Sequence, residues 1–234
     1  MMAGYEGEEK LKQFDSSQPP SSKNHTATDY NVLIYIPNII GYIRLSFLVL
    51  AFLLLPTSPA LFITFYSISI TLDGFDGYAA RKLQQCSIFG AWFDVVIDNV
   101  SRGLLWTHLH PMLYLIAAVE WTAFVCNHSF GSEWRDKLSH GHQIRPPKLI
   151  GLAMANNFRN PWGIWTIAGL HVLPVWLLGL QYDVFNSHLW FIPYCIKIGG
   201  LIVLGLGRLL CLFVELWSIW IHITMMLVNV TAKE

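Results

Sequence analysis

Four aspartates in residues 73–98 are the side chains of this chain best suited to chemistry. They are Asp73, Asp76, Asp94 and Asp98, and the sequence around them is largely apolar. Carboxylates at membrane depth are costly, so such residues are functional by default. On helices, the i, i+3 pair and the i, i+4 pair would each share one face. Carboxylates grouped in this way predict a site for a divalent metal ion, because hard cations prefer oxygen ligands.

A polar run separates the two aspartate pairs. Residues 84–87 read Gln-Gln-Cys-Ser, which predicts a turn between two helices. Asp76 and Asp94 lie about 9 residues from this turn, and Asp73 and Asp98 lie about 12 to 13 residues from it. Because every helical residue adds the same rise, the two members of each pair would lie at similar heights along the helix axes. Two antiparallel helices would therefore bring all four carboxylates into one small volume.

The composition places these aspartates in a membrane protein. Hydrophobic residues make up 54% of the chain and charged residues 13%, which is too apolar for an ordinary soluble domain. The formal net charge of zero gives no support for a nucleic-acid partner. The four cysteines are dispersed and form no CxxC pair, which favours buried thiols over a zinc or disulfide framework.

Hydropathy predicts an all-α integral membrane protein with six transmembrane helices. The predicted spans cover roughly residues 35–55, 59–80, 89–108, 111–128, 162–180 and 198–228. The second and third carry the aspartates, and their less hydrophobic inner ends predict a polar cavity open to the cytosolic side. Residues 1–30 are polar, so we expect a disordered cytosolic tail before a membrane domain at residues 31–230.

Lysine and arginine predict the orientation of the chain, because cytosolic loops carry an excess of both. The predicted inner loops hold Arg81, Lys82, Arg135, Lys137, Arg145, Lys148 and Arg159. The outer loops, near residues 56–58, 108–111 and 181–188, hold none. We therefore expect both termini and the aspartates on the cytosolic side of the membrane.

The residues between the aspartates complete a longer pattern. It reads Asp73-x2-Asp76-Gly77-x2-Ala80-Arg81-x8-Gly90-x3-Asp94-x3-Asp98. This pattern resembles, at every fixed position, the signature of the CDP-alcohol phosphotransferase family. Members of that family are integral membrane enzymes that cleave a CDP-linked donor, release CMP and join the phosphoryl group to an alcohol. The resemblance implies the same class of activity for this chain.

The resemblance also implies roles for the four aspartates. Asp73, Asp76 and Asp94 would be metal ligands, and the metal would be Mg²⁺ or Mn²⁺, with two ions in the site. Asp98 would be the general base that takes the proton of the alcohol, and it would also contact metal.

Four further residues of the pattern have a role in donor binding or in packing. By resemblance, Gly77, Ala80 and Arg81 contribute to the CDP site, where Arg81 offers a fork of donors to phosphate. Gly77 and Ala80 leave room for a close helix or for the nucleotide, and Gly90 would relieve crowding opposite them. Taken alone, the small residues are equally well explained as packing residues and Arg81 as a boundary charge.

A second segment narrows the family resemblance. Residues 37–44, Pro-Asn-Ile-Ile-Gly-Tyr-Ile-Arg, resemble the first span of eukaryotic phosphatidylinositol synthases. Asn38 would then hydrogen-bond near the nucleotide. The resemblance implies CDP-diacylglycerol and myo-inositol as substrates, membrane lipids as surroundings and the endoplasmic reticulum as location. Relatives are commonly dimers, so a homodimer is a further expectation.

Two departures keep the acceptor alcohol open. Asn99 follows the last aspartate, where the inositol enzymes usually show Arg, and Glu120 stands where Asp is expected, at the start of a divergent segment, residues 120–160. Glycerol phosphate, ethanolamine or choline are alternative acceptors. A catalytically silent family member that binds lipid or acts as a scaffold is the alternative from another class.

Overall fold

The structure is a computed structural model, and it describes residues 30–130, 146–189 and 191–231. Within these residues every element is a helix, which confirms the predicted all-α class. Of the expected tail at residues 1–30, residues 1–29 lie outside them, and Tyr30 begins a 3-10 helix. The predicted inner-loop charges Arg135, Lys137 and Arg145 also lie outside the described residues. The described residues divide into two compact units, the first containing those within 30–53 and 64–97 and the second those within 54–63 and 98–231.

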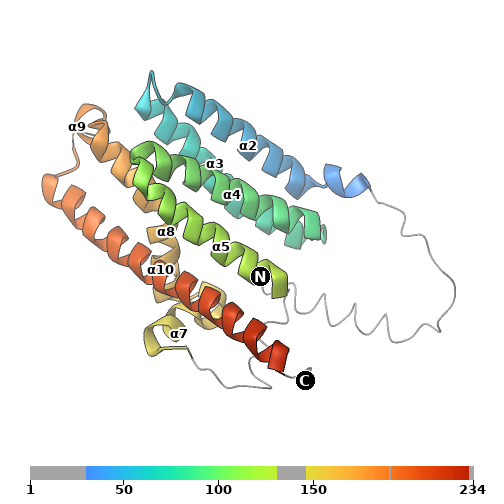
Figure 1. The fold of residues 1–234 in the computed structure, drawn as a ribbon. Helices are drawn as coiled ribbons and strands as arrows, with labels where there is room; N and C mark the ends of the chain where they lie inside the picture. Colours follow the sequence, from blue (N-terminus) through green and yellow to red (C-terminus); the bar gives the residue numbers. More distant parts are fainter. Residues whose placement is uncertain (1–29, 131–145, 190, 232–234) are drawn as a thin grey trace. The chain divides into compact units, whose positions relative to one another are not determined.

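The first unit contains the 3-10 helix η1 and most of two long helices, together with the start of a third. These elements are η1 (Tyr30–Ile34), α2 (Ile36–Leu54), α3 (Pro59–Lys82) and α4 (Ile88–Leu109). Within this unit α2, α3 and α4 run alongside one another (Figure 1). The predicted turn is confirmed, because α3 ends at Lys82 and α4 begins at Ile88. Gln84 adopts a positive φ of 55° in this turn, a conformation that is uncommon for residues other than glycine.

Side-chain contacts between α2 and its two neighbours define the packing of the first unit. The rings of Phe47 and Phe65 stack with centroids 5.9 Å apart, and those of Tyr42 and Phe93 tilt together at 5.2 Å. A Cβ atom at Gly41 would lie 2.9 Å from the Phe93 ring, so glycine is required while that ring keeps its position. These contacts turn one face of α2 towards α3 and α4.

The second unit contains residues 54–63, the end of α4 and the later helices of the described part of the chain. These later helices are η2 (Pro111–Leu113), α5 (Tyr114–Phe130), α7 (Lys148–Met154), η3 (Ala155–Phe158), α8 (Pro161–Gln181), α9 (Val184–Ser187) and α10 (Tyr194–Thr231). The longest helix, α10, packs against α8 and α5. The Trp165 indole of α8 donates to the carbonyl of Val203 in α10 at 2.8 Å.

Helix α8 has clear sequence signals at its start and a close contact in its middle. The Asn160 side chain accepts from the amide of Gly163 at 2.9 Å, and Pro161 stands in the first turn, so the helix is capped and preorganised. Further along, a Cβ atom at Gly169 would lie 2.3 Å from the backbone nitrogen of Arg208. The two helices therefore meet backbone to backbone at this glycine.

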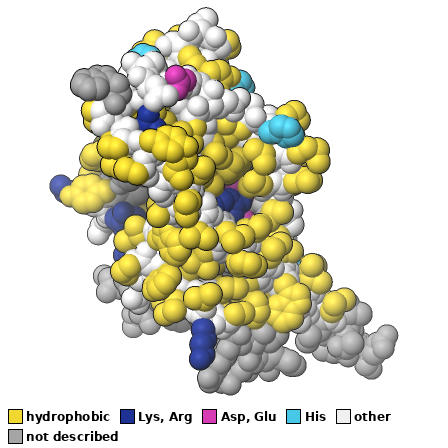
Figure 2. Space-filling model, turned by 90° about the vertical axis from the view of Figure 1, so that its left-hand side faces the viewer, with side chains coloured by type: hydrophobic (Ala, Val, Ile, Leu, Met, Phe, Trp, Pro, Cys, Tyr) yellow, Lys and Arg dark blue, Asp and Glu magenta, His cyan; other side chains and the backbone are white. Residues whose placement is uncertain are grey.

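Three of the described helices are long and apolar enough to cross a membrane. They are Ile36–Leu54, Pro161–Gln181 and Tyr194–Leu227. Hydrophobic side chains gather over much of the described surface in Figure 2, as expected for a surface in contact with lipid. The protein is therefore an integral membrane protein.

The six predicted spans correspond to helices, but only in part to membrane-crossing ones. α3 and α4 carry the aspartates and other charges, which lowers their hydropathy. α5 has 17 residues, fewer than the ~20 that cross a bilayer without adjustment. Six crossings and a cavity open to the cytosol therefore stay predictions.

Candidate functional site

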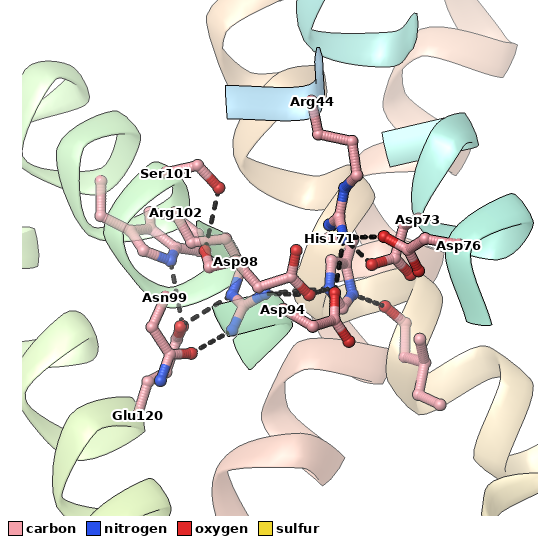
Figure 3. A network of polar contacts seen from close by, with 12 residues as sticks. Arg44, Asp73, Asp76, Asp94, Asp98, Asn99, Ser101, Arg102, Glu120 and His171 are labelled. Carbon is pink, nitrogen blue, oxygen red and sulfur yellow. Dashed lines mark hydrogen bonds and ion pairs between the residues drawn. The ribbon is translucent and has the colours of Figure 1, made fainter. Parts of the chain in front are cut away.

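Three of the four predicted aspartates meet in the first unit. Asp73 and Asp76 lie one turn apart on α3, and Asp94 faces them from α4 (Figure 3). Each contributes a carboxylate oxygen to a group whose atoms all lie within 4.8 Å of one another. The turn after Lys82 brings α4 back along α3, which is why residues so separated in sequence share one site.

The three carboxylates differ in their exposure. The Asp76 side chain is 11% exposed, whereas those of Asp73 and Asp94 are 40% and 42% exposed. The group therefore has one buried carboxylate and two that are partly exposed.

Arg44 of α2 is the cation of this group. Its Nη2 lies 2.6 Å from Asp73 Oδ1, and its Nη1 lies 2.6 Å from Asp76 Oδ2 and 2.5 Å from Asp94 Oδ1. The Arg44 side chain is 1% exposed. The hydroxyl of Ser69 donates to the Arg44 carbonyl at 3.3 Å, which joins α2 and α3 at the same level. Sequence reasoning gave Arg44 no role. An arginine inside an apolar helix is as costly to bury as the aspartates are, so it too indicates a functional residue.

The donor set fits a hard divalent cation. Mg²⁺ takes oxygen ligands at about 2.0–2.1 Å in octahedral geometry, so opposite ligands stand about 4.2 Å apart. Neighbouring ligands stand only about 2.9 Å apart in this geometry. The three carboxylate oxygens, within 4.8 Å of one another, would therefore move closer together around a bound ion. Asp73, Asp76 and Asp94 would be the residues that hold the ion.

Asp98 belongs to the second unit, one helical turn after Asp94 on α4. Its Oδ2 lies 3.2 Å from Nε2 of His171 and 3.4 Å from Nη1 of Arg102, and its side chain is 25% exposed. Among the described residues, the group of metal-compatible ligands comprises the other three aspartates. The prediction of one shared cluster is therefore confirmed for those three and stays a prediction for Asp98.

The residues predicted for the CDP site lie at the end of α3. Arg81 is exposed, and its Nη1 would lie 3.4 Å from a Cβ atom at Gly77. Gly77 therefore faces the side chain of Arg81 and not a neighbouring helix. The carbonyl of Ala80 accepts from the amide of Gln85 at 2.9 Å, within the turn. The role of Gly77 in donor binding stays a prediction.

Asn38 and Gly90 are neighbours, which corrects one expectation. A Cβ atom at Gly90 would lie 2.7 Å from Oδ1 of Asn38, so Gly90 makes room for α2 and not for Gly77 or Ala80. Asn38 is 3% exposed, and its Nδ2 donates to the carbonyl of Val32 at 2.5 Å. Asn38 thus ties α2 to the preceding η1 helix.

A buried network of charges surrounds Arg102 in the second unit (Figure 3). Its Nε donates to Glu120 Oε2 at 2.9 Å and its Nη2 donates to Asn99 Oδ1 at 2.5 Å. Its Nη1 lies 2.9 Å from Nε2 of His171. Asn99 and Glu120, the two departures noted in the sequence, are therefore both partners of Arg102.

The network continues from Glu120 into α10. Glu120 Oε1 accepts from Arg208 Nη2 at 3.2 Å and from the Trp106 indole at 3.3 Å. Arg208 Nη1 donates to Glu215 Oε2 at 3.1 Å. Sequence reasoning missed Arg208 and Glu215, although opposite charges seven positions apart in an apolar helix are themselves a signal of pairing.

Comparison with known proteins supports the resemblance over part of the chain. Residues 34–129 match the family model described as CDP-alcohol phosphatidyltransferase. This range includes Arg44, the four aspartates, Arg102 and Glu120. It stops before α8 and α10, so His171 and Arg208 lie outside the matched residues.

Two curated relatives illustrate the extent of the similarity. The chain is 41% identical over 95 residues to the CDP-diacylglycerol--inositol 3-phosphatidyltransferase of Candida albicans, covering 41% of each chain. It is 41% identical over 86 residues to the protein of the same name from Homo sapiens, covering 37% of this chain and 40% of the human one. The chain thus spans about two fifths of the length of these relatives. No solved structure shows a significant match.

Proposed function

We propose that this chain, whose residues 34–129 carry a CDP-alcohol phosphatidyltransferase segment, transfers a phosphatidyl group from CDP-diacylglycerol to myo-inositol. The products would be phosphatidylinositol and CMP. The observation that carries the proposal is the group of three carboxylates from α3 and α4, with oxygens within 4.8 Å, at the spacing of the family signature. We treat residues 31–230 as the domain that performs this reaction.

The proposed reaction exchanges one phosphorus–oxygen bond for another. The alcohol oxygen forms a bond to the phosphorus that carries diacylglycerol. The bond from that phosphorus to the bridging oxygen of the pyrophosphate breaks, and CMP leaves with the bridging oxygen. The proton of the alcohol goes to a carboxylate of the protein. No oxidant or reductant is needed.

The first unit would serve the donor. When bound at Asp73, Asp76 and Asp94, Mg²⁺ or Mn²⁺, in one or two copies, would neutralise the pyrophosphate and the charge that develops on CMP. Arg81, exposed at the end of α3, is available to donate to a donor phosphate. The open surface of Gly77 beside it is compatible with a nucleotide close to the backbone.

Asp98 is the proposed general base. It follows Asp94 by one turn on the same helix, so the two carboxylates project from one face of α4. Its contacts to Arg102 and His171 would hold the carboxylate in one orientation, which matters because a carboxylate is a weak base and positioning must supply much of the rate. Its 25% exposure leaves it accessible to an alcohol.

Inositol as the acceptor is supported by the names of the relatives and by the resemblance of residues 37–44. Asn99 and Glu120, the two departures from the inositol enzymes, both contact Arg102, and they are the reason for testing other alcohols as well. Location in the endoplasmic reticulum belongs to the same proposal and rests on the family resemblance, whereas cytosolic termini are supported by the distribution of Lys and Arg. A homodimer, which the resemblance implies, is testable by the mass of the purified protein in detergent.

The deciding experiment is CMP release by the purified full chain in proteoliposomes. CDP-diacylglycerol and Mg²⁺ or Mn²⁺ are supplied with myo-inositol, glycerol phosphate, ethanolamine or choline. We expect CMP release that requires both the divalent ion and myo-inositol. Release with another alcohol would reassign the acceptor. Absence of release with every alcohol, while the human relative turns over in parallel, would favour the silent lipid-binding alternative.

The role of Asp98 is separable from metal binding. Asp98→Asn should abolish transfer while CDP-diacylglycerol still binds, because the donor site lies with the other three aspartates. Asp76→Asn is the matched control and should lose both. Equal loss of donor binding in the two variants would show that Asp98 acts chiefly as a metal ligand.

A further inference from the structure

Arg44 contacts the same carboxylates that would hold a divalent ion. One guanidinium nitrogen lies 2.6 Å from Asp76 and 2.5 Å from Asp94, and the other lies 2.6 Å from Asp73 (Figure 3). The side chain is 1% exposed, so the guanidinium has exchanged water for these three partners. It is therefore the cation that holds α3 and α4 together at this level.

The charges of these four side chains do not balance. Three carboxylates and one guanidinium leave an excess of two negative charges, which is the charge that one divalent cation neutralises. The carboxylate oxygens lie within 4.8 Å of one another, where like charges repel strongly. Arg44 offsets one of these three negative charges, and a divalent ion would offset two.

Arg44 and a divalent ion compete for the same space. An ion would ligate carboxylate oxygens at about 2.0–2.1 Å. Those oxygens already have guanidinium nitrogens at 2.5–2.6 Å, and two cations between them would repel. We propose that Arg44 is an exchangeable counter-cation: it holds Asp73, Asp76 and Asp94 together before metal binding, and the incoming ion displaces it from them.

The displacement has a consequence that can be measured on the protein alone. Because coupling between two ligands is reciprocal, a side chain that the ion must displace lowers the affinity for that ion. Removing Arg44 should therefore tighten metal binding, while the metal-free protein loses stability. This inference rests on the metal site of the proposed function, and it needs neither the donor nor the alcohol.

The test is Mn²⁺ binding to the purified full chain, with free Mn²⁺ followed by electron paramagnetic resonance and no substrate present. We expect Arg44→Gln to bind Mn²⁺ at least about fivefold more tightly than the wild type, the lower end of usual coupling. Arg44→Lys keeps the charge but reaches fewer carboxylates at once, so it should be displaced more easily and should also bind Mn²⁺ more tightly. The melting temperature of Arg44→Gln should be lower without Mn²⁺ and should rise more than that of the wild type on its addition.

Arg208→Gln is the matched control, because Arg208 is also buried but pairs with Glu120 and Glu215 in the second unit. It should lose stability with no change in Mn²⁺ affinity. Arg44→Lys keeps the positive charge, so tighter Mn²⁺ binding by this variant would reflect easier displacement of the side chain and not the loss of repulsion between two cations. If Arg44→Gln does not fold, the Mn²⁺ affinity of Arg44→Lys alone tests the proposal. An affinity equal to or weaker than the wild type in Arg44→Lys would overturn the proposal, as would absence of Mn²⁺ binding in every variant. Absence of CMP release with Mn²⁺ binding as expected would overturn the proposed function alone.

Discussion

Each of the two units has an arginine at the centre of a polar cluster, and the clusters differ in charge balance. Around Arg44 in the first unit, carboxylates outnumber the cation, and two of them are about 40% exposed. In the second unit Arg102 and Arg208 are matched by Glu120 and Glu215, and each of these four side chains is at most 11% exposed. The four side chains of the first cluster carry a net charge of −2 and include two partly exposed carboxylates. The charges of Arg102, Arg208, Glu120 and Glu215 sum to zero, and these side chains are enclosed.

This difference separates a binding group from a structural one. Buried charges are tolerated when each is paired. A network whose charges balance then has no net charge with which to attract a charged ligand. An unbalanced cluster stores repulsion, which a ligand of the opposite charge relieves on binding. Asp98 lies at the border between these cases, because it contacts the balanced network through Arg102 yet is 25% exposed. Its position fits a residue that the network orients and that a substrate can reach.

The largest effect is expected from unbalancing the second unit. Glu120→Gln removes the carboxylate shared by Arg102 and Arg208 and should cost about 3–5 kcal/mol of unfolding free energy, as for other broken buried pairs. Titration with sodium dodecyl sulfate in mixed micelles would measure this loss. Mn²⁺ affinity should not change, because Glu120 lies outside the carboxylate group.

Glu215→Gln provides the control for that prediction. Arg208 would still have Glu120, so the loss should be smaller than for Glu120→Gln. Equal losses would mean that the shared position of Glu120 carries no special weight, and the network would then be a set of independent pairs.

The opposite response is expected in the first unit. Asp76→Asn removes one charge from a cluster that already has too many, and Arg44 keeps Asp73 and Asp94 as partners. Stability should be unchanged or slightly higher, whereas Mn²⁺ affinity should fall about 10²-fold, because even supporting residues of metal sites matter up to that extent. Both quantities can be measured on one preparation. If Asp76→Asn destabilised the protein as much as Glu120→Gln, the two clusters would not differ as a binding group and a structural one.

The helices and the carboxylate group were predictable from sequence because both depend on local pattern. Hydropathy placed the starts of three predicted spans near residues 59, 111 and 162, and the structure has helices starting at Pro59, Pro111 and Pro161. The polar run after Lys82 indicated the turn. Counting residues outward from that turn then brought Asp73, Asp76 and Asp94 together, since the rise per residue of a helix is constant.

The remaining contacts depend on how helices rotate and pack, which local pattern does not specify. Arg44 meets the aspartates because one face of α2 turns towards them, and Gly90 meets Asn38 for the same reason. The pair Glu120–Arg208 joins residues 88 positions apart, from two helices whose order in sequence says nothing about their contact. Polar residues in apolar helices were a signal that partners exist, but not of which partners.

The two units also differ in what lies closest to a glycine at a helix contact: a backbone atom at Gly169 in the second unit and a side-chain ring at Gly41 in the first. Substituting Gly169 should have a smaller effect on stability than the changes above. Gly169→Ala would place its Cβ 2.3 Å from the backbone nitrogen of Arg208. Backbone cannot rotate away, so α8 and α10 must separate, at a cost of about 2 kcal/mol, within the usual range for overpacking. Thermal unfolding followed by tryptophan fluorescence would report the change, because Trp165 lies in the same interface. A neutral result would mean that the two helices can slide apart freely.

The smallest effect is expected at Gly41, where the obstacle is a side chain. A Cβ there would lie 2.9 Å from the Phe93 ring, which is partly exposed and can turn, so Gly41→Ala should cost less than about 1 kcal/mol. Phe93→Leu combined with Gly41→Ala should recover that cost by removing the ring, and the double-mutant cycle would measure the coupling between the two positions. Because Phe93 precedes Asp94 directly, Mn²⁺ affinity provides a second measurement on the same variants. A change in affinity at Gly41→Ala that Phe93→Leu reverses would show that packing of α2 against α4 positions a metal ligand, and not only the helices.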